Sequence, residues 1–330
     1  MATPRFDDIR DRCHVVSIPL TTPFRGLTTR EVLLLEGPAG PAEWSPFLEY
    51  ADDEAATWLT ATLEQAFDPD PHTPSTVRVN GTIPAVAAQD VAALVHGAGD
   101  PTTIKVKVGG PGTTLADDVA RVSAVRKALG PSGRIRIDAN ASWTLDEAEH
   151  AIREMEHLDL DYVEQPVADL ADMSELRRRI SRLGIAVAAD ESIRRLSDID
   201  AVIAAEACDV VVVKVQPLGG LRATRAVATT ALAAGLEVVV SSALETSVGL
   251  YRGAQMVGWL AEHTEVVYDA GLGTQGFLGM DVVESPLSSH GGVMSVNLPV
   301  LDLAHVEALR ASPERSAWWS ARLERCLALL

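Results

Sequence analysis

Three carboxylates recur at an even spacing in the middle of the chain, and each comes at the end of a short run of β-forming residues. Asp138 closes RIRID, Glu164 closes LDYVE and Asp190 closes IAVAAD, and both intervals are 26 residues (164 − 138 and 190 − 164). A strand and the helix that crosses back to a parallel neighbour occupy about this length. The spacing therefore predicts one acid at the same end of three neighbouring parallel strands.

Eight segments of nearly continuous apolar character fit the strands of such a sheet, and amphipathic segments separate them. The expected strands cover residues 82–88, 103–108, 134–139, 160–165, 185–190, 210–215, 236–243 and 265–270. Runs of Val and Ile without polar alternation indicate a sheet that is buried on both faces. We therefore predict an α/β fold, a modified TIM-type (β/α)7β barrel, with a doubly wound open sheet as the alternative.

The two ends of the chain have a different pattern from its middle. The first 80 residues predict two antiparallel strands around a polar loop and then an amphipathic helix, while the tail has a strand-like VMSVNLPVL and a terminal helix. We interpret residues 1–85 as the N-terminal part of an α+β capping domain, 86–285 as the catalytic barrel, and 286–330 as the segment that completes the cap.

Composition excludes several classes of partner and site. The net charge of −18 argues against nucleic acid and anionic membranes, because phosphate groups bind basic surfaces. Three dispersed cysteines without a CxxC pattern argue against a disulfide framework or a structural zinc site. Without an apolar segment at the start or a run of 18 apolar residues, we expect a cytoplasmic protein. A monomer is slightly favoured over a homo-oligomer, and the expected partner is a small carboxylate substrate.

The acids and three lysines together predict a particular chemistry. Three adjacent carboxylates repel one another unless a cation lies between them, and an all-oxygen set suits Mg²⁺ or Mn²⁺. Lys105 and Lys107 in TIKVKVGG share one face of a strand, and Lys214 follows in VVVVKVQP. Burial and a neighbouring cation lower the pKa of a lysine, which suits it to act as a base. A lysine on each side of a metal-bound carboxylate suits abstraction of the α-proton.

Several motifs, in their order along the chain, resemble a known group of enzymes. KVK, IDAN, VEQP, ADES and VVKVQPLGG resemble the muconate-lactonizing-enzyme subgroup of the enolase superfamily, which uses a Lys or His base with Mg²⁺. PLTTPFRGLTTREVLLLEGPAG, VRVNGTIPAV, SSALETSVGL and GLGTQGFLGMDVV resemble, within it, the o-succinylbenzoate synthase family of the actinobacterial type. The resemblance implies a carbon–oxygen lyase (a hydro-lyase). It would catalyse the Mg²⁺-dependent syn-dehydration of 2-succinyl-6-hydroxy-2,4-cyclohexadiene-1-carboxylate in menaquinone biosynthesis.

The resemblance also implies a role for individual residues. Asp138, Glu164 and Asp190 resemble the metal ligands, Lys107 the acid/base lysine and Lys214 the lysine on the opposite face. Lys105 resembles the helper that keeps the pKa of its partner low. The residues that resemble groups contacting or orienting the substrate are Asn140, Glu191, Ser241, Ser242, Gly271, Leu272, Phe24 and Arg25. The chain departs from its relatives at PAEWSPF, where they often carry a GWGE-type turn, and Glu43, Ser45 and Pro46 are the plausible equivalents.

Other functions stay open at this point. Racemisation of N-succinylamino acids or epimerisation of dipeptides would use the same lysine pair, and a non-catalytic barrel would only bind a metal or a partner. Glycine runs after two strands match no phosphate-binding motif, and Ser241–Ser242 lacks the GxSxG context of a nucleophilic serine. Ordinary turns are the better interpretation of both.

Overall fold

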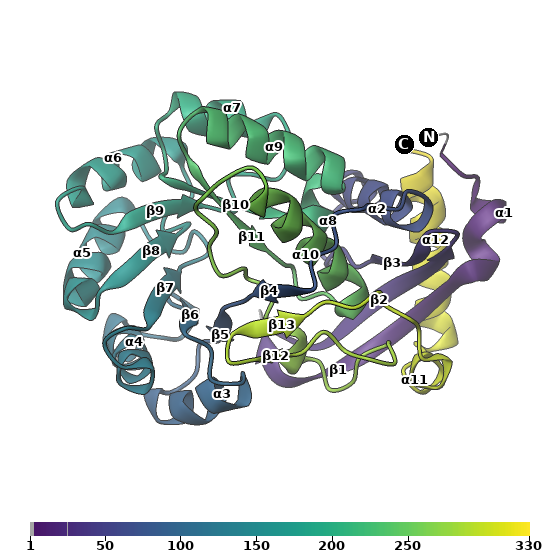
Figure 1. The fold of residues 1–330 in the computed structure, drawn as a ribbon, viewed down its shortest axis with the longest axis horizontal. Helices are drawn as coiled ribbons and strands as arrows, with labels where there is room; N and C mark the ends of the chain where they lie inside the picture. The colour runs from purple at the N-terminus through teal and green to yellow at the C-terminus, as the bar shows by residue number, and fades with distance from the viewer. Residues whose placement is uncertain (1–2, 25) are drawn as a thin grey trace.

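The fold consists of a parallel barrel with a smaller antiparallel layer against one side of it (Figure 1). The structure is a computed structural model, and it describes residues 3–24 and 26–330. Seven parallel strands form the barrel sheet in the spatial order of the chain: β5 (Gly81–Ile83), β6 (Thr103–Lys107), β7 (Arg134–Asp138), β8 (Leu160–Glu164), β9 (Ala186–Ala189), β10 (Val210–Lys214) and β11 (Glu237–Ser241). The prediction of a barrel is confirmed, and the open-sheet alternative is excluded.

Helices connect these strands and cover the outside of the sheet (Figure 1). They are α3 (Val91–Gly97), α4 (Leu115–Leu129), α5 (Leu145–Met155), α6 (Leu170–Ile180), α7 (Asp198–Ala204), α9 (Leu221–Ala233) and α10 (Ser247–Ala261). The single turn α8 (Val215–Leu218) follows β10 directly and instead packs against the capping helix over residues 52–67. Local sequence explains where two of them begin, because Thr114 and Thr144 each form a capping box with the acid three residues later. Buried Val, Ile, Leu and Ala side chains fill the space between helices and sheet.

An extended segment, rather than a full eighth strand, closes the barrel. Val79 pairs with Ala270 and Ser241 pairs with Gly271, each as a single parallel bridge. The predicted strand over 265–270 is therefore wrong in its first part, where Val266 and Val267 are 47% and 43% exposed. The predicted strand over 82–88 is also too long, since the chain leaves β5 and enters a 3-10 helix at Ala88–Asp90. A run of apolar residues does not show at which residue a strand loses its hydrogen-bonded neighbour.

The antiparallel sheet is built from the first part of the chain. β1 (Cys13–Phe24), β2 (Leu27–Gly37) and β3 (Gly40–Trp44) lie in that order, after α1 (Phe6–Ile9) and the 3-10 turn Arg10–Arg12. The amphipathic helix that the sequence predicts here is α2 (Asp52–Phe67); it covers the sheet, and α12 (Pro313–Leu327) packs beside it (Figure 1). A cluster of buried side chains that includes Trp44, Trp58 and Trp319 joins these elements.

The rest of the tail contributes a third, small sheet. β13 (Val293–Ser295) lies between β12 (Ser289–His290) and β4 (Thr76–Arg78) and pairs with both, and α11 (Leu303–Ala308) follows. Thus the strand-like VMSVNLPVL pairs with the chain just before the barrel, whereas the terminal helix packs on the antiparallel sheet. No helix in the described part of the chain combines the length and apolar character needed to span a membrane.

Candidate active site

The strand register places the charged residues side by side at one end of the barrel. Lys107 pairs with Asp138, Asp138 with Glu164, and Glu164 with Ala188, two residues before Asp190. Lys214 ends β10, which is four positions from β6 in a ring of eight that the 270–271 segment completes. Lys107 and Lys214 therefore face each other across the carboxyl ends of the strands, where barrel enzymes place their chemistry.

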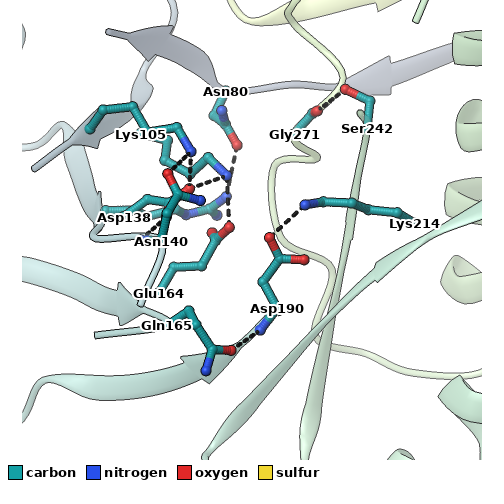
Figure 2. Close-up of polar contacts among 12 residues, drawn as sticks. Asn80, Lys105, Asp138, Asn140, Glu164, Gln165, Asp190, Lys214, Ser242 and Gly271 are labelled. Atoms are coloured by element: carbon teal, nitrogen blue, oxygen red, sulfur yellow. Dashed lines mark hydrogen bonds and ion pairs between the residues drawn. The ribbon is translucent and has the colours of Figure 1, made fainter. Parts of the chain in front are cut away.

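The three predicted metal ligands are buried and in contact with lysines. Asp138 and Glu164 are 0% exposed and Asp190 is 1% exposed. Nζ of Lys105 lies 2.8 Å from Oε1 of Glu164 and 3.0 Å from Oδ2 of Asp138. Figure 2 shows Lys105 and Lys214 approaching the carboxylates from opposite sides, with Lys214 donating to Asp190. The structure thus brings together the acids and lysines that the sequence singled out.

Lysine is a rare residue in this protein, and its positions are informative. The sequence contains only four lysines among 28 basic residues, and Lys105, Lys107 and Lys214 all line one pocket. The fourth, Lys127, is exposed on α4. Arginine, which replaces lysine elsewhere, stays charged at all relevant pH values, whereas a lysine can exchange a proton. The use of lysine at the barrel mouth is therefore compatible with proton transfer as well as with charge pairing.

Opposite charges at close range set the protonation of the cluster. Burial would raise the pKa of Asp138, but the ammonium groups of Lys107 and Lys105 outweigh it and hold that pKa well below its usual range. Burial would likewise lower the pKa of Lys105, yet Glu164 and Asp138 raise it well above the ordinary value. The expectation of a depressed lysine pKa is therefore wrong for Lys105, which is an ammonium donor held by two carboxylates.

The donor set fits a hard divalent cation. Among residues 3–24 and 26–330, no three carboxylate, His or Cys side chains already converge as a metal cluster, because ammonium groups lie between the acids. Yet three buried carboxylates with only oxygen donors are the ligands that Mg²⁺ and Mn²⁺ prefer. Burial and the negative charge of Asp138 raise the pKa of Glu164, so a cation would compete with a proton there. In this structure the ammonium groups of Lys105 and Lys214 supply the positive charge beside these acids.

Residues just after the strand ends hold the acids in place. Asn140, with a left-handed φ of 45°, accepts from Nζ of Lys107 at 2.8 Å and donates to Oε1 of Glu191 at 3.0 Å. Gln165, with φ 38°, accepts from the backbone N–H groups of Asp190 and Ser192 at 2.9 and 3.1 Å (Figure 2). Sequence reasoning missed Gln165, although the VEQP motif contains it.

The predicted substrate contacts on the far side of the barrel are partly assembled. Ser241, Ser242 and Gly271 line the pocket, and the hydroxyl of Ser242 donates to the Gly271 carbonyl at 2.7 Å. Leu272 is 0% exposed and packs in the barrel core. It is not among the described residues that line the pocket. Phe24 lines the pocket and packs against Phe277, with ring centroids 5.0 Å apart and the ring planes tilted by 31°. Arg25, the remaining candidate, lies outside the described residues.

The capping elements supply pocket residues that the sequence did not reveal. Phe47, Tyr50 and Trp58 line the same pocket as the lysines, together with Arg194 from the loop after β9. No periodic pattern marks these residues, because they come from a loop and one helix face that meet the barrel only in the folded chain.

A second group of buried carboxylates joins the capping sheet to the barrel; we call it the seam. Glu43 in β3 accepts from the N–H groups of Thr246 and Gly249, at 3.0 and 3.1 Å, where α10 begins. It also accepts from the Ser45 hydroxyl at 2.7 Å. Glu245 accepts from Nε2 of Gln216 at 3.0 Å. Of the predicted cap-turn equivalents, Glu43 and Ser45 therefore bind the barrel loop rather than line the pocket.

Family comparisons agree with this arrangement. A family described as "Enolase C-terminal domain-like" matches residues 86–299, and one described as "Enolase N-terminal domain-like" matches residues 15–66. Among curated relatives, the o-succinylbenzoate synthase of Thermobifida fusca (strain YX) is 47% identical over 309 residues, which cover 93% of each chain. That of Mycobacterium tuberculosis (strain ATCC 25618 / H37Rv) is 41% identical and covers 99% of this chain and 97% of its own.

Solved structures show the same fold at lower identity. A muconate lactonizing enzyme from Pseudomonas fluorescens in complex with muconolactone superposes with a TM-score of 0.77 at 20% identity, over 91% of this chain and 98% of that chain. A substrate-liganded L-Ala-D/L-Glu epimerase from Bacillus subtilis gives a TM-score of 0.74 at 22% identity, over 88% and 96%. At these identities the likeness establishes the fold alone.

Proposed function

Since this chain belongs to the enolase superfamily and, within it, to the o-succinylbenzoate synthase family, we propose that it dehydrates 2-succinyl-6-hydroxy-2,4-cyclohexadiene-1-carboxylate to o-succinylbenzoate. The observation that carries the proposal is the pair of lysines facing each other over three buried acids, in a chain 41–47% identical to curated synthases. This reaction would serve menaquinone biosynthesis. The cytoplasmic location and the monomeric state stay predictions.

Charge balance supports a dianionic substrate. The pocket contains four basic groups, Lys105, Lys107, Lys214 and Arg194, against four acidic ones, Asp138, Glu164, Asp190 and Glu191. With all four basic groups protonated, a divalent cation would leave the site with an excess of about two positive charges, and with Lys107 in its amine form an excess of about one. The proposed substrate carries two carboxylates, one on the ring and one on the succinyl arm, so this excess of positive charge favours its binding.

Asp138, Glu164 and Asp190 would hold the cation, and Mg²⁺ is proposed over Mn²⁺. When bound, such an ion supplies Lewis-acid stabilisation of negative charge that develops on a substrate carboxylate. The chain's own part is to keep three anionic oxygen donors together in a buried site. Gln165 fixes the backbone of Asp190, and Asn140 fixes the position of Lys107 relative to Asp138.

Lys107 would carry the proton through both halves of the reaction. In its amine form, Nζ takes the α-proton, and the C–H electron pair moves toward the ring carboxylate to give an enediolate. The same Nζ then returns the proton to the leaving hydroxyl, the C–O bond breaks on the same face, and water departs. Lys214, as an ammonium on the other face, stabilises the negative charge of the enediolate. Loss of water makes the ring aromatic, which drives the second half.

A second candidate activity follows from the same pair of lysines. Bases on opposite faces of an α-carbon can racemise an N-succinylamino acid or epimerise a dipeptide, and Lys214 is placed for the second proton transfer. This activity would share the metal ligands and the pocket. It differs in requiring Lys214 to exchange a proton rather than only to supply charge.

One experiment separates the two activities. Purified protein with Mg²⁺ is given the cyclohexadiene in one arm and an N-succinylamino acid in D₂O in the other. We expect rapid appearance of the aromatic product by ultraviolet absorbance, which EDTA abolishes. Fast α-deuteration with racemisation, together with no dehydration, would contradict the synthase assignment.

A further inference from the structure

A buried ion pair on α4 contacts the end of the strand that carries Lys107. Asp118 and Arg121 are each 2% exposed, and Nη1 of Arg121 lies 2.6 Å from Oδ1 of Asp118. Taking two charges out of water is costly, and their attraction repays it only where the remaining polar atoms also find partners. The other partners of this pair therefore indicate which part of the fold it serves.

The pair binds three backbone groups at the carboxyl end of the barrel strands. Nη1 of Arg121 donates to the Lys107 carbonyl at 2.9 Å, and its Nε donates to the Val86 carbonyl, in the loop after β5, at 2.6 Å. Oδ2 of Asp118 accepts from the N–H of Gly109 at 2.7 Å. The pair therefore fixes both the last residue of β6 and the loop that follows it.

The sheet itself holds this end of β6 on one side only. Lys107 pairs with Asp138 in β7. On the other side, β5 ends at Ile83, which pairs with Val106, so the register of β5 stops one residue short of Lys107. Arg121 supplies a contact to the Lys107 backbone from α4 at the position that β5 does not reach.

The loop after Lys107 also passes close to its neighbour. Gly109 has a left-handed φ of 66°, and a Cβ there would lie 2.2 Å from Oγ of Ser142 and 2.8 Å from Nε1 of Trp143, in the loop after β7. The N–H that Asp118 binds therefore belongs to a residue with almost no free space around it. A change in its position would be passed to the backbone of Lys107.

We propose that Asp118 and Arg121 are positioning residues for Lys107, which hold the end of β6 so that Nζ stays within reach of the substrate α-proton. Neither is among the described residues that line the pocket, so the pair acts through the backbone. Displacing a catalytic group by about 1 Å can lower a rate about 100-fold. The inference rests on the proposed function, because it takes Lys107 to be the acid/base group.

The same helix offers a matched control. Arg126 is also on α4, and its guanidinium donates at 2.7–3.1 Å to the backbone carbonyls of Gly130, Gly133, Leu158 and Asp159. These carbonyls precede β7 and β8, so they lie at the end of the barrel away from the lysines. Arg121→Met and Arg126→Met therefore remove comparable backbone contacts at opposite ends of the strands.

Steady-state dehydration of the cyclohexadiene, with a Mg²⁺ titration of each variant, tests the role. Arg121→Met should lower kcat by roughly 10–100-fold, because Nζ of Lys107 is displaced. Its KM and its affinity for Mg²⁺ should stay near those of the wild type, because the predicted metal ligands lie on other strands. Arg126→Met should keep the wild-type kcat, although both substitutions lower the urea midpoint of unfolding.

A double variant guards against loss of the fold. Asp118→Asn combined with Arg121→Met leaves no lone buried carboxylate, and it should show the same loss of kcat as Arg121→Met. A kcat equal to that of Arg126→Met, or a loss of Mg²⁺ affinity as large as the loss of kcat, overturns the positioning role while the wild type still dehydrates the cyclohexadiene. A wild type that does not dehydrate it overturns the proposed function and, with it, this role.

Discussion

Two groups of buried carboxylates in this molecule have opposite surroundings. At the barrel mouth, Asp138, Glu164 and Asp190 face the ammonium groups of three lysines. At the seam, Glu43 and Glu245 are satisfied mainly by neutral donors, which are backbone N–H groups, hydroxyls and an amide. Both groups are almost inaccessible to water, so burial alone does not decide what a carboxylate does.

The difference lies in what can replace the donors. An ammonium group is a mobile point charge that a metal ion can displace, whereas the N–H groups at the start of α10 are fixed in the helix and favour negative charge there. The mouth is therefore suited to bind and release a cation and to move a proton. The seam is suited to hold the capping sheet on the loop that forms one wall of the pocket.

The seam has its own cation, which acts through the backbone. Arg30 in β2 is 2% exposed and donates to the carbonyls of Leu244 and Ala243, at 3.0 and 3.2 Å, and to that of Ser45. Leu244 has a left-handed φ of 62°, a strained conformation for a residue with a side chain. Arg30 thus stabilises a bent loop whose residues line the pocket.

The largest expected effect on activity comes from removing the Lys107 side chain at the barrel mouth. Lys107→Ala should lower kcat by roughly 10²–10⁴-fold, because a positioned acid/base group contributes about that much to a proton transfer. Its far-ultraviolet circular dichroism and melting temperature should stay near wild type. Lys127→Ala, at the exposed lysine, is the matched control and should retain full activity. Comparable activity of both variants would contradict the role of Lys107.

The next effect concerns an acid at the mouth. Asp190→Asn removes one anionic donor of nearly unchanged size, and the affinity for Mg²⁺ should fall by at least about 10–100-fold, the loss seen when groups that merely orient a ligand are changed. Isothermal titration calorimetry measures it. An affinity equal to that of the wild type would show that Asp190 does not bind the metal.

Replacing Arg30 at the seam should lower the stability of the fold more than it lowers the catalytic rate. Arg30→Met leaves three carbonyls without this donor, and the free energy of unfolding should fall by about 2–4 kcal/mol. Urea unfolding measures the loss, and Arg182→Met, at an exposed arginine, should change it by less than about 0.5 kcal/mol. Equal losses of unfolding free energy from the two substitutions would show that Arg30 has no particular role in stability.

The smallest effect is a dependence of stability on pH. Burial and, next, the charge of Glu245 raise the pKa of Glu43 to about 7 from 4.5. Since the folded state binds this proton more tightly, its contribution to stability is complete below about pH 4.5 and is lost as the pH rises through 7. The change is at most on the order of 3 kcal/mol.

Glu43→Gln has no such proton and should lose this part of the slope. Denaturation of both proteins in urea at several pH values from about 4.5 to 8 measures the difference, with the exposed Glu284→Gln as the control that keeps the wild-type slope. Parallel pH profiles for wild type and Glu43→Gln would show that Glu43 does not titrate on folding.

The mouth could be predicted from the sequence, and the seam could not. A strand–helix unit of regular length places Asp138, Glu164 and Asp190 in adjacent strands, and a period of two places Lys105 and Lys107 on one face, so spacing alone encodes that site. Glu43 and Arg30 act through contacts with a loop about 200 residues further on. No local pattern records such contacts.

The expectation for Lys105 failed for a related reason. Sequence reasoning considered burial and the neighbouring lysine, both of which lower a lysine pKa, but could not show that two carboxylates lie within 3.0 Å of Nζ. At that distance the attraction outweighs desolvation, and the pKa of Lys105 rises. The distance from Nζ to the carboxylates, and not the residue type, decides whether the pKa of Lys105 rises or falls.

Restoration of activity by Mg²⁺ tests the contrast between the two groups most directly. Protein stripped with EDTA is titrated with Mg²⁺ while the dehydration of the cyclohexadiene is followed by ultraviolet absorbance. The wild type and Glu43→Gln should be inactive at the start and regain activity along the same one-site curve, while Asp190→Asn needs far more metal. Full activity in EDTA, or a curve shifted as much by Glu43→Gln as by Asp190→Asn, would contradict the account.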